Sequence, residues 1–150
     1  MIGEIRDEES ANIAIRSATT GHLVFSTLHA NDAPTAITRL LDMKIQPFLI
    51  ANSLKAVIYQ KLIKKRCDKC KKEIINNGKV EVINEGCSFC HYTGLSGRVA
   101  LGEMLYIDDT IQRAIINNNF DEVLENEIKN KKFIRIAQNI KKAKKQNIIK

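Results

Sequence analysis

Four cysteines carry the strongest chemical signal in this sequence of 150 residues. They form two C-x2-C pairs, Cys67 with Cys70 and Cys87 with Cys90, separated by sixteen residues. Each pair presents two thiolates from one turn, and two such pairs can surround Zn²⁺ as a tetrahedron. Because all four positions are sulfur, we expect a closed structural zinc site, with the adjacent His91 a bystander. Two disulfides or four unrelated buried thiols are the alternatives.

A second group of polar residues surrounds the segment HLVFST. His22 is its first residue, Thr27 is its last, and His29 lies two residues beyond it. Glu4 follows the short apolar start Met1-Ile2 and Gly3. Polar groups at the carboxyl ends of parallel strands face the ligand crevice, so Glu4, Thr27 and His29 are expected to line one crevice. In a nucleotide-hydrolysing fold, an acid at this place holds Mg²⁺ directly or through water. The alternatives are ordinary structural histidines and a solvated helix start that places acids near the helix dipole.

Two helix caps and one strand are expected to position these residues. Asp7 caps a helix that runs to about Thr19, and Asp32 caps a second helix. The segment HLVFST has no polar face, so it is expected to be a strand buried on both sides. A third helix is expected to begin at Pro47 and to carry an apolar side made of Ile50, Leu54, Val57, Ile58 and Leu62. This order indicates an α/β layer with a parallel sheet, for which these residues supply too few strands.

Composition divides the chain into three parts. Residues 1–63 read as part of an α/β core, and residues 64–98 read as a small tetracysteine zinc module. Residues 99–150 read as a strand followed by a helical, basic C-terminal tail. A strand is expected at 99–105 and a helix cap at Asp108 and Asp109.

The net charge of +7 is concentrated in the tail. Residues 129–150 contain nine Lys/Arg and no acids. Such a tail is either a solvated helix or a surface attracted to anionic lipid or an acidic partner. Nucleic-acid binding is not expected, because neither aromatic stacking groups nor a recognisable nucleic-acid module accompanies the charge. The sequence has no apolar run of ~20 residues and no signal peptide, so a cytoplasmic location is expected.

Several motifs together resemble one family. The stretch GEIRDEESANIAIRSATTGHLVFSTLHANDAPTAITRLLDM, the two C-x2-C pairs and the segment GCSFCHYTGLSGR resemble the ATPases that power type II secretion and type IV pilus assembly (GspE/PilB-like). The tetracysteine insert favours the secretion and assembly branch over the retraction motors. The resemblance implies a RecA-like P-loop ATPase fold, ATP with Mg²⁺, and a cytoplasmic homo-hexamer. It also implies docking on an inner-membrane platform protein, with peripheral association at the membrane.

The resemblance also implies roles for individual residues. Glu4 matches the Walker B acid that supports Mg²⁺ and the attacking water, and His22 and His29 match the histidine box. The turn after the second cysteine pair matches at Gly94, Gly97 and Arg98. By the same match, the four cysteines are the zinc ligands.

One motif of the family is missing from these residues. The phosphate-cradling pattern G-x-x-x-x-G-K-[ST] does not occur, and in the family it precedes the Walker B acid. The chain is therefore expected to be the C-terminal portion of such a motor, from Walker B onward, and to be inactive by itself. The alternative is a zinc-stabilised interaction module that docks on an inner-membrane platform protein or an anionic membrane.

Overall fold

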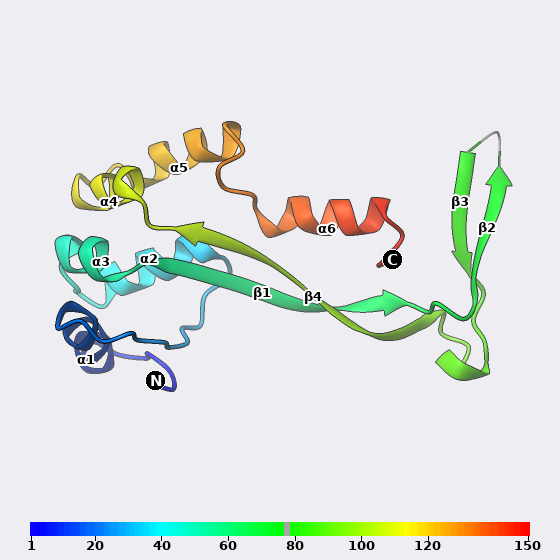
Figure 1. The fold of residues 1–150 in the computed structure, drawn as a ribbon, viewed down its shortest axis with the longest axis horizontal. Helices are drawn as coiled ribbons and strands as arrows, with labels where there is room; N and C mark the ends of the chain where they lie inside the picture. Colours follow the sequence, from blue (N-terminus) through cyan, green and yellow to red (C-terminus); the bar gives the residue numbers. More distant parts are fainter. Residues whose placement is uncertain (77–78) are drawn as a thin grey trace. The chain divides into compact units, whose positions relative to one another are not determined.

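The computed structural model describes residues 1–76 and 79–150. The order of its elements is shown in Figure 1: α1 (Glu8–Thr19), α2 (Ala33–Asp42), α3 (Pro47–Ser53), β1 (Ala56–Arg66), β2 (Lys71–Asn76), β3 (Lys79–Asn84), a short 3₁₀ turn η1 (Ser88–Cys90), β4 (Leu95–Tyr106), α4 (Asp109–Ile116), α5 (Phe120–Lys129) and α6 (Ile136–Lys145). They divide between two compact units. The first unit holds residues 1–59 and 103–135, and the second unit holds residues 60–102 and 136–150. The division into 1–63, 64–98 and 99–150 stays a prediction.

The predicted helix caps are confirmed. The Asp7 carboxylate accepts a hydrogen bond from the backbone N–H of Ser10 at 2.8 Å, and Asp32 accepts one from Thr35 at the same distance. Asp108 caps α4 in the same way, whereas Asp109, predicted as part of this cap, is the first residue of the helix. Each carboxylate satisfies a backbone N–H that has no partner inside its helix, which fixes where the helix begins.

The core of the first unit is built from the apolar sides of its helices. Ile37 of α2 and Ile50 of α3 are fully buried, and Ile111 and Ile115 of α4 are 2% exposed. Burying an aliphatic side chain of this size contributes roughly 1.5–3 kcal/mol relative to leaving it exposed. This core holds the helices whose N-terminal loops carry the polar site residues.

The helix predicted from Pro47 to Leu62 is wrong beyond its first part. Helix α3 ends at Ser53, and the strand β1 begins at Ala56. Strand β1 pairs with β4, which runs in the opposite direction (Figure 1). The β-branched and aromatic residues at the start of β1 suit a pleated strand, and the partner that decides the matter lies about forty residues later in the chain.

The prediction that HLVFST is a buried strand is also wrong. Leu23 is 81% exposed and Phe25 is 63% exposed. Residues 25–27 do pair in parallel with residues 2–5, through Ile2 N–H to Phe25 O at 2.9 Å and a bridge between Glu4 and Thr27. The segment has a paired edge on this side, but its apolar side chains stay open to solvent.

The second unit contains the cysteines. Strands β2 and β3 form an antiparallel hairpin with Lys71 opposite Asn84. The strand predicted at 99–105 is confirmed as part of β4, and its first residues lie in this unit. The predicted helical tail is three helices, interrupted by Asn118 and Lys131 in the left-handed conformation. The last residues fold back, with Ile149 buried and bridged to Lys65.

Among the helices of the described residues, none combines the length and apolar character that a membrane crossing requires.

Candidate functional site

Glu4 and His29 contact each other in the first unit. The Oε1 atom of Glu4 lies 2.9 Å from Nε2 of His29, and its Oε2 atom accepts a hydrogen bond from Nε of Arg6 at 2.8 Å. Both partners come from loops at the ends of the short parallel pair. The carboxylate is 21% exposed and the imidazole is 85% exposed, so a ligand can reach both groups.

The parallel pairing sets the geometry of this contact. Thr27 N–H donates to Gly3 O at 3.3 Å, and the Thr27 hydroxyl donates to the same oxygen at 2.8 Å. Ile5 N–H donates to Thr27 O at 2.8 Å. These bonds align the two chain segments so that Glu4 and His29 leave them at the same end, as the strand-end rule predicts.

His22 lies at the other end of the segment. Its Nδ1 atom is 3.2 Å from the Thr20 hydroxyl and 3.3 Å from Ser17 O, at the C-terminal end of α1. The structure therefore brings Glu4, Thr27 and His29 together, and it places His22 apart from them.

Charge at Glu4 is stabilised by its neighbours. The hydrogen bond from Arg6 lowers the pKa of Glu4 below its ordinary value, and the positive charges of Arg6, His29 and Arg39 act in the same direction. The carboxylate is thus held in its ionised form, which can bind a divalent cation or accept a hydrogen bond.

The loop that carries His29 is fixed by residues that sequence reasoning missed. Arg39 Nη1 donates to His29 O, and the buried carboxylate of Glu103 accepts a hydrogen bond from Ala33 N–H at 2.7 Å. Arg135 Nη1 lies 3.7 Å from the Asp32 carboxylate. Glu103 and Ala33 are 70 residues apart in sequence, so no local pattern could have identified this pair.

The four cysteines gather at one point of the second unit. Their Sγ atoms all lie within 4.8 Å of one another. Three of the Sγ–Sγ separations are 4.0 Å for Cys67 with Cys87, 3.9 Å for Cys70 with Cys90, and 3.8 Å for Cys87 with Cys90. They are free thiols, and these distances are far above the ~2.05 Å of a disulfide.

This geometry fits a zinc ion. A tetrahedron with Zn–S bonds of about 2.3 Å has edges of about 3.8 Å, close to the three separations of 3.8–4.0 Å given above. Burial alone would raise the pKa of Cys90, but hydrogen bonds from the backbone N–H groups of Cys87 and Gly94 help to lower it to about 6. Burial raises the pKa of Cys70. The exposed His91 lies in a left-handed turn beside the cluster.

The comparisons with known proteins agree on one family. The family model described as "Type II/IV secretion system protein" matches residues 1–150. The chain is 47% identical over 115 residues to "Type II secretion system protein HxcR" of Pseudomonas aeruginosa, which covers 77% of this chain and 24% of that protein. It is 39% identical over 142 residues to "Type II secretion system ATPase E" of Vibrio cholerae, covering 86% of this chain and 28% of the relative.

Other relatives belong to pilus systems. The chain is 42% identical over 131 residues to "Type IV pilus assembly ATPase PilB" of Thermus thermophilus, covering 77% of the chain and 15% of the relative. The chain thus spans 15–28% of the length of these three curated relatives.

A solved structure supports the same assignment. The fold resembles the crystal structure of the pilus retraction motor PilT with bound ADP, at a TM-score of 0.69 and 27% identity, over 99% of this chain and 36% of that one. The chain belongs to the type II/IV secretion system protein family.

Proposed function

We propose that the chain forms part of a motor ATPase that drives type II secretion or type IV pilus assembly. The observation that carries this proposal is the contact between Glu4 and His29 at neighbouring segment ends, in a chain of this family. Three of the curated relatives are named as ATPases of secretion or pilus assembly. The motor would be a cytoplasmic homo-hexamer that docks peripherally on an inner-membrane platform protein.

Glu4 and Thr27 are the residues suited to hold Mg²⁺ with ATP. A carboxylate and a hydroxyl are oxygen ligands of the kind that Mg²⁺ prefers, and the two residues are bridged across the parallel pair. When bound, Mg²⁺ neutralises charge that develops on the phosphates. Glu4 would orient the attacking water and accept a proton at Oε1, and the imidazole of His29 would hold that oxygen in place. His22 would act as the second histidine-box residue near the terminal phosphate or a subunit interface.

The structural role of the second unit is to hold zinc. We assign Cys67, Cys70, Cys87 and Cys90 as ligands of one structural Zn²⁺, because their four Sγ atoms all lie within 4.8 Å of one another. Four thiolates leave the site with a formal charge of −2, which nearby lysines offset. Metal analysis of the purified chain should give about one zinc per chain, and a ratio near zero in protein never exposed to chelator would contradict the assignment.

A chimera tests the ATPase proposal. Residues 1–150 replace the matching segment of the Vibrio cholerae ATPase E, and ATP hydrolysis is measured for the chimera and for the 150-residue chain alone. We expect Mg²⁺-dependent hydrolysis by the chimera and none by the chain, because these residues contain no phosphate-cradling loop. A folded chimera without activity would count against the proposal.

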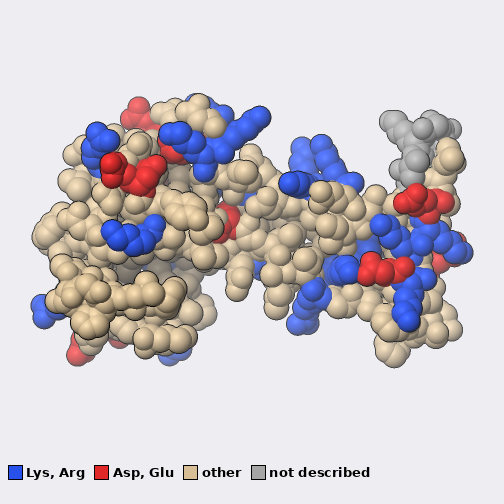
Figure 2. Space-filling view, viewed as in Figure 1, with Lys and Arg blue, Asp and Glu red and all other residues tan. Residues whose placement is uncertain are grey.

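The charge distribution favours a second function, that of an interaction module. The second unit contains fourteen Lys/Arg and four Asp/Glu, and Figure 2 shows Lys and Arg side chains gathered over α6. A surface of this kind would dock on an acidic face of the platform protein or on an anionic membrane. Sedimentation with anionic vesicles tests whether this surface binds a membrane. Binding that is unchanged after removal of residues 141–150 would show that the tail does not contribute to it.

A further inference from the structure

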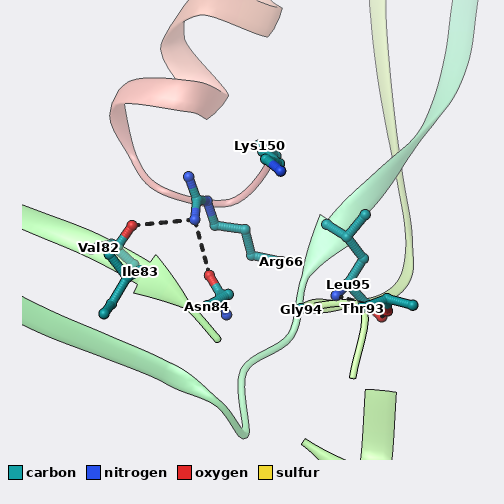
Figure 3. Close-up of a pocket in the computed structure, with 8 residues that line it drawn as sticks. All are labelled: Arg66, Val82, Ile83, Asn84, Thr93, Gly94, Leu95 and Lys150. Carbon is teal, nitrogen blue, oxygen red and sulfur yellow. Dashed lines mark hydrogen bonds between the residues drawn. The ribbon is translucent and has the colours of Figure 1, made fainter. Parts of the chain in front are cut away.

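Asn84, at the end of β3, connects two parts of the second unit. Its Oδ1 atom accepts a hydrogen bond from Arg66 Nη1 at 3.0 Å, as Figure 3 shows. Its Nδ2 atom donates to Cys67 O at 2.7 Å and lies 3.7 Å from Cys70 Sγ. A guanidinium only donates and a carbonyl only accepts, so these partners fix which way the amide faces.

The N–H group of Asn84 is directed at a sulfur that has little access to water. Cys67 is fully buried and Cys70 is 8% exposed. Four thiolates concentrate negative charge, and a donor near one of them stabilises the sulfur and fixes its direction. Removing a group that hydrogen-bonds to a metal ligand typically lowers the affinity for the metal about 10- to 100-fold.

Arg66 holds Asn84 and also joins it to the end of the chain. The Nη1 atom of Arg66 donates to Val82 O at 3.2 Å as well as to Asn84, and its Nε atom donates to Ile149 O at 3.2 Å. Its backbone N–H donates to Ile148 O at 2.9 Å. Arg66 therefore contacts the hairpin and the folded-back tail from one position beside the first cysteine.

A cavity of about 260 Å³ lies beside this network. Its lining residues, drawn in Figure 3, are Arg66, Val82, Ile83, Asn84, Thr93, Gly94, Leu95 and Lys150. Cys67 N–H donates to Gly94 O at 2.9 Å, which ties the turn after the second cysteine pair to the first pair. The amide of Asn84 thus borders this cavity.

We propose that Asn84 is a positioning residue for the four-cysteine site, which it holds through Cys67 O and Cys70 Sγ while Arg66 ties it to residues 148–149. The inference rests on the proposed zinc site. Loss of the Asn84 donor should leave zinc in place but less firmly held, since the four ligands themselves remain.

The test compares zinc release from the full 150-residue chain and its variants. Asn84→Ala removes all three side-chain contacts. Asn84→Asp keeps the acceptor for Arg66 but removes the donor to Cys67 O and Cys70 Sγ. The matched control is Asn139→Ala, because Asn139 Nδ2 donates to Gly102 O at 2.7 Å in the same unit without contacting a cysteine. Transfer of zinc to a coloured chelator gives the rate, and the absorption of the Co²⁺-substituted chain reports the sulfur directly.

We expect both Asn84 variants to release zinc at least about tenfold faster than the wild type, with the control within about twofold. The sulfur-to-cobalt charge-transfer band should move to lower energy in both, because an unbonded thiolate gives up an electron more easily. Unchanged release and an unchanged band in the Asn84 variants would overturn the inference, as would equal acceleration in Asn139→Ala. A wild-type chain that binds no zinc would instead overturn the zinc site itself.

Discussion

At the scale of single residues, two carboxylates near the start of the chain are held by different kinds of hydrogen bond. Glu4 accepts a hydrogen bond from the side chain of Arg6 and contacts His29, so its negative charge belongs to the candidate functional site. Asp7 accepts hydrogen bonds from the backbone N–H and the hydroxyl of Ser10, so its negative charge stabilises the N-terminus of α1. The two groups therefore predict different effects of substitution.

The cap at Asp7 predicts a change in stability with pH. Hydrogen bonds from the backbone and the hydroxyl of Ser10 lower the pKa of Asp7 below its ordinary value of 3.8. A lowered folded-state pKa adds stability that is present above the unfolded value and is lost as the pH falls through the folded value. Asp7→Asn keeps a capping oxygen but cannot titrate, so its unfolding free energy should fall less steeply between about pH 5 and pH 2.

Chemical denaturation at several pH values measures this effect. Asp42→Asn, a change at an exposed carboxyl outside the cap, is the control. Parallel pH profiles for Asp7→Asn and the wild type would contradict the assigned role of the cap.

Two glycines of the cysteine region make a second prediction at this scale. Gly86 has φ +96°, and a Cβ there would lie 2.5 Å from Tyr92 O. Gly97 has φ +73°, and a Cβ there would meet nothing within 4 Å. Gly97→Ala should cost only about 1–2 kcal/mol of backbone strain, whereas Gly86→Ala must also displace backbone next to Cys87.

Zinc content and release after mild chelation distinguish the two glycine variants. Gly86→Ala should lose zinc faster than Gly97→Ala. Equal loss from both variants would show that the contact with Tyr92 does not matter for the metal site.

At the scale of elements, the end of the chain is held against β1. Ile149 is 1% exposed and bridges to Lys65. Ile149→Ala should lower the free energy of unfolding by about 2–5 kcal/mol and make the nearby lysines of α6 easier for trypsin to cleave. Ile134→Ala, at a side chain that is 46% exposed, should have a much smaller effect. Equal denaturation midpoints for the two variants would contradict the packing of the tail.

Local signals in the sequence predict part of this architecture. The caps at Asp7, Asp32 and Asp108 are confirmed because a cap is decided by its own carboxylate and the next three residues. The strand β1 was missed because its partner β4 is distant in sequence, and a short apolar run reads equally as helix or strand. The prediction that HLVFST is buried was wrong, because the hydrophobic pattern of a segment does not show whether other elements cover it.

The same distinction applies to the site residues. The position of Glu4 and His29 after predicted strands predicted that they lie close together. The spacing of the two C-x2-C pairs predicted that the four sulfurs cluster. Glu103 and Asn84 were missed because each acts through a hydrogen bond to a residue that only the folded chain brings near. Their sequence neighbours give no signal of a site.

At the scale of the whole molecule, charge is divided between the two units. The second unit carries fourteen Lys/Arg against four acids, whereas the first carries ten against thirteen. The basic character predicted for the tail therefore extends to the region around the cysteines. Most acids, including the proposed catalytic Glu4, lie in the first unit. The proposed ATPase residues and the proposed basic docking surface therefore lie on different units.

The measurement that tests the central claim most directly is the ATPase rate of the chimera after Glu4→Gln. Glu8→Gln is the matched control, because Glu8 is an exposed acid in the first turn of α1. We predict that Glu4→Gln lowers the rate of ATP hydrolysis by about 100-fold or more and that Glu8→Gln leaves it within about twofold. Hydrolysis by the Glu4→Gln chimera at the unmodified rate would contradict the assignment of this chain to the catalytic part of a motor ATPase.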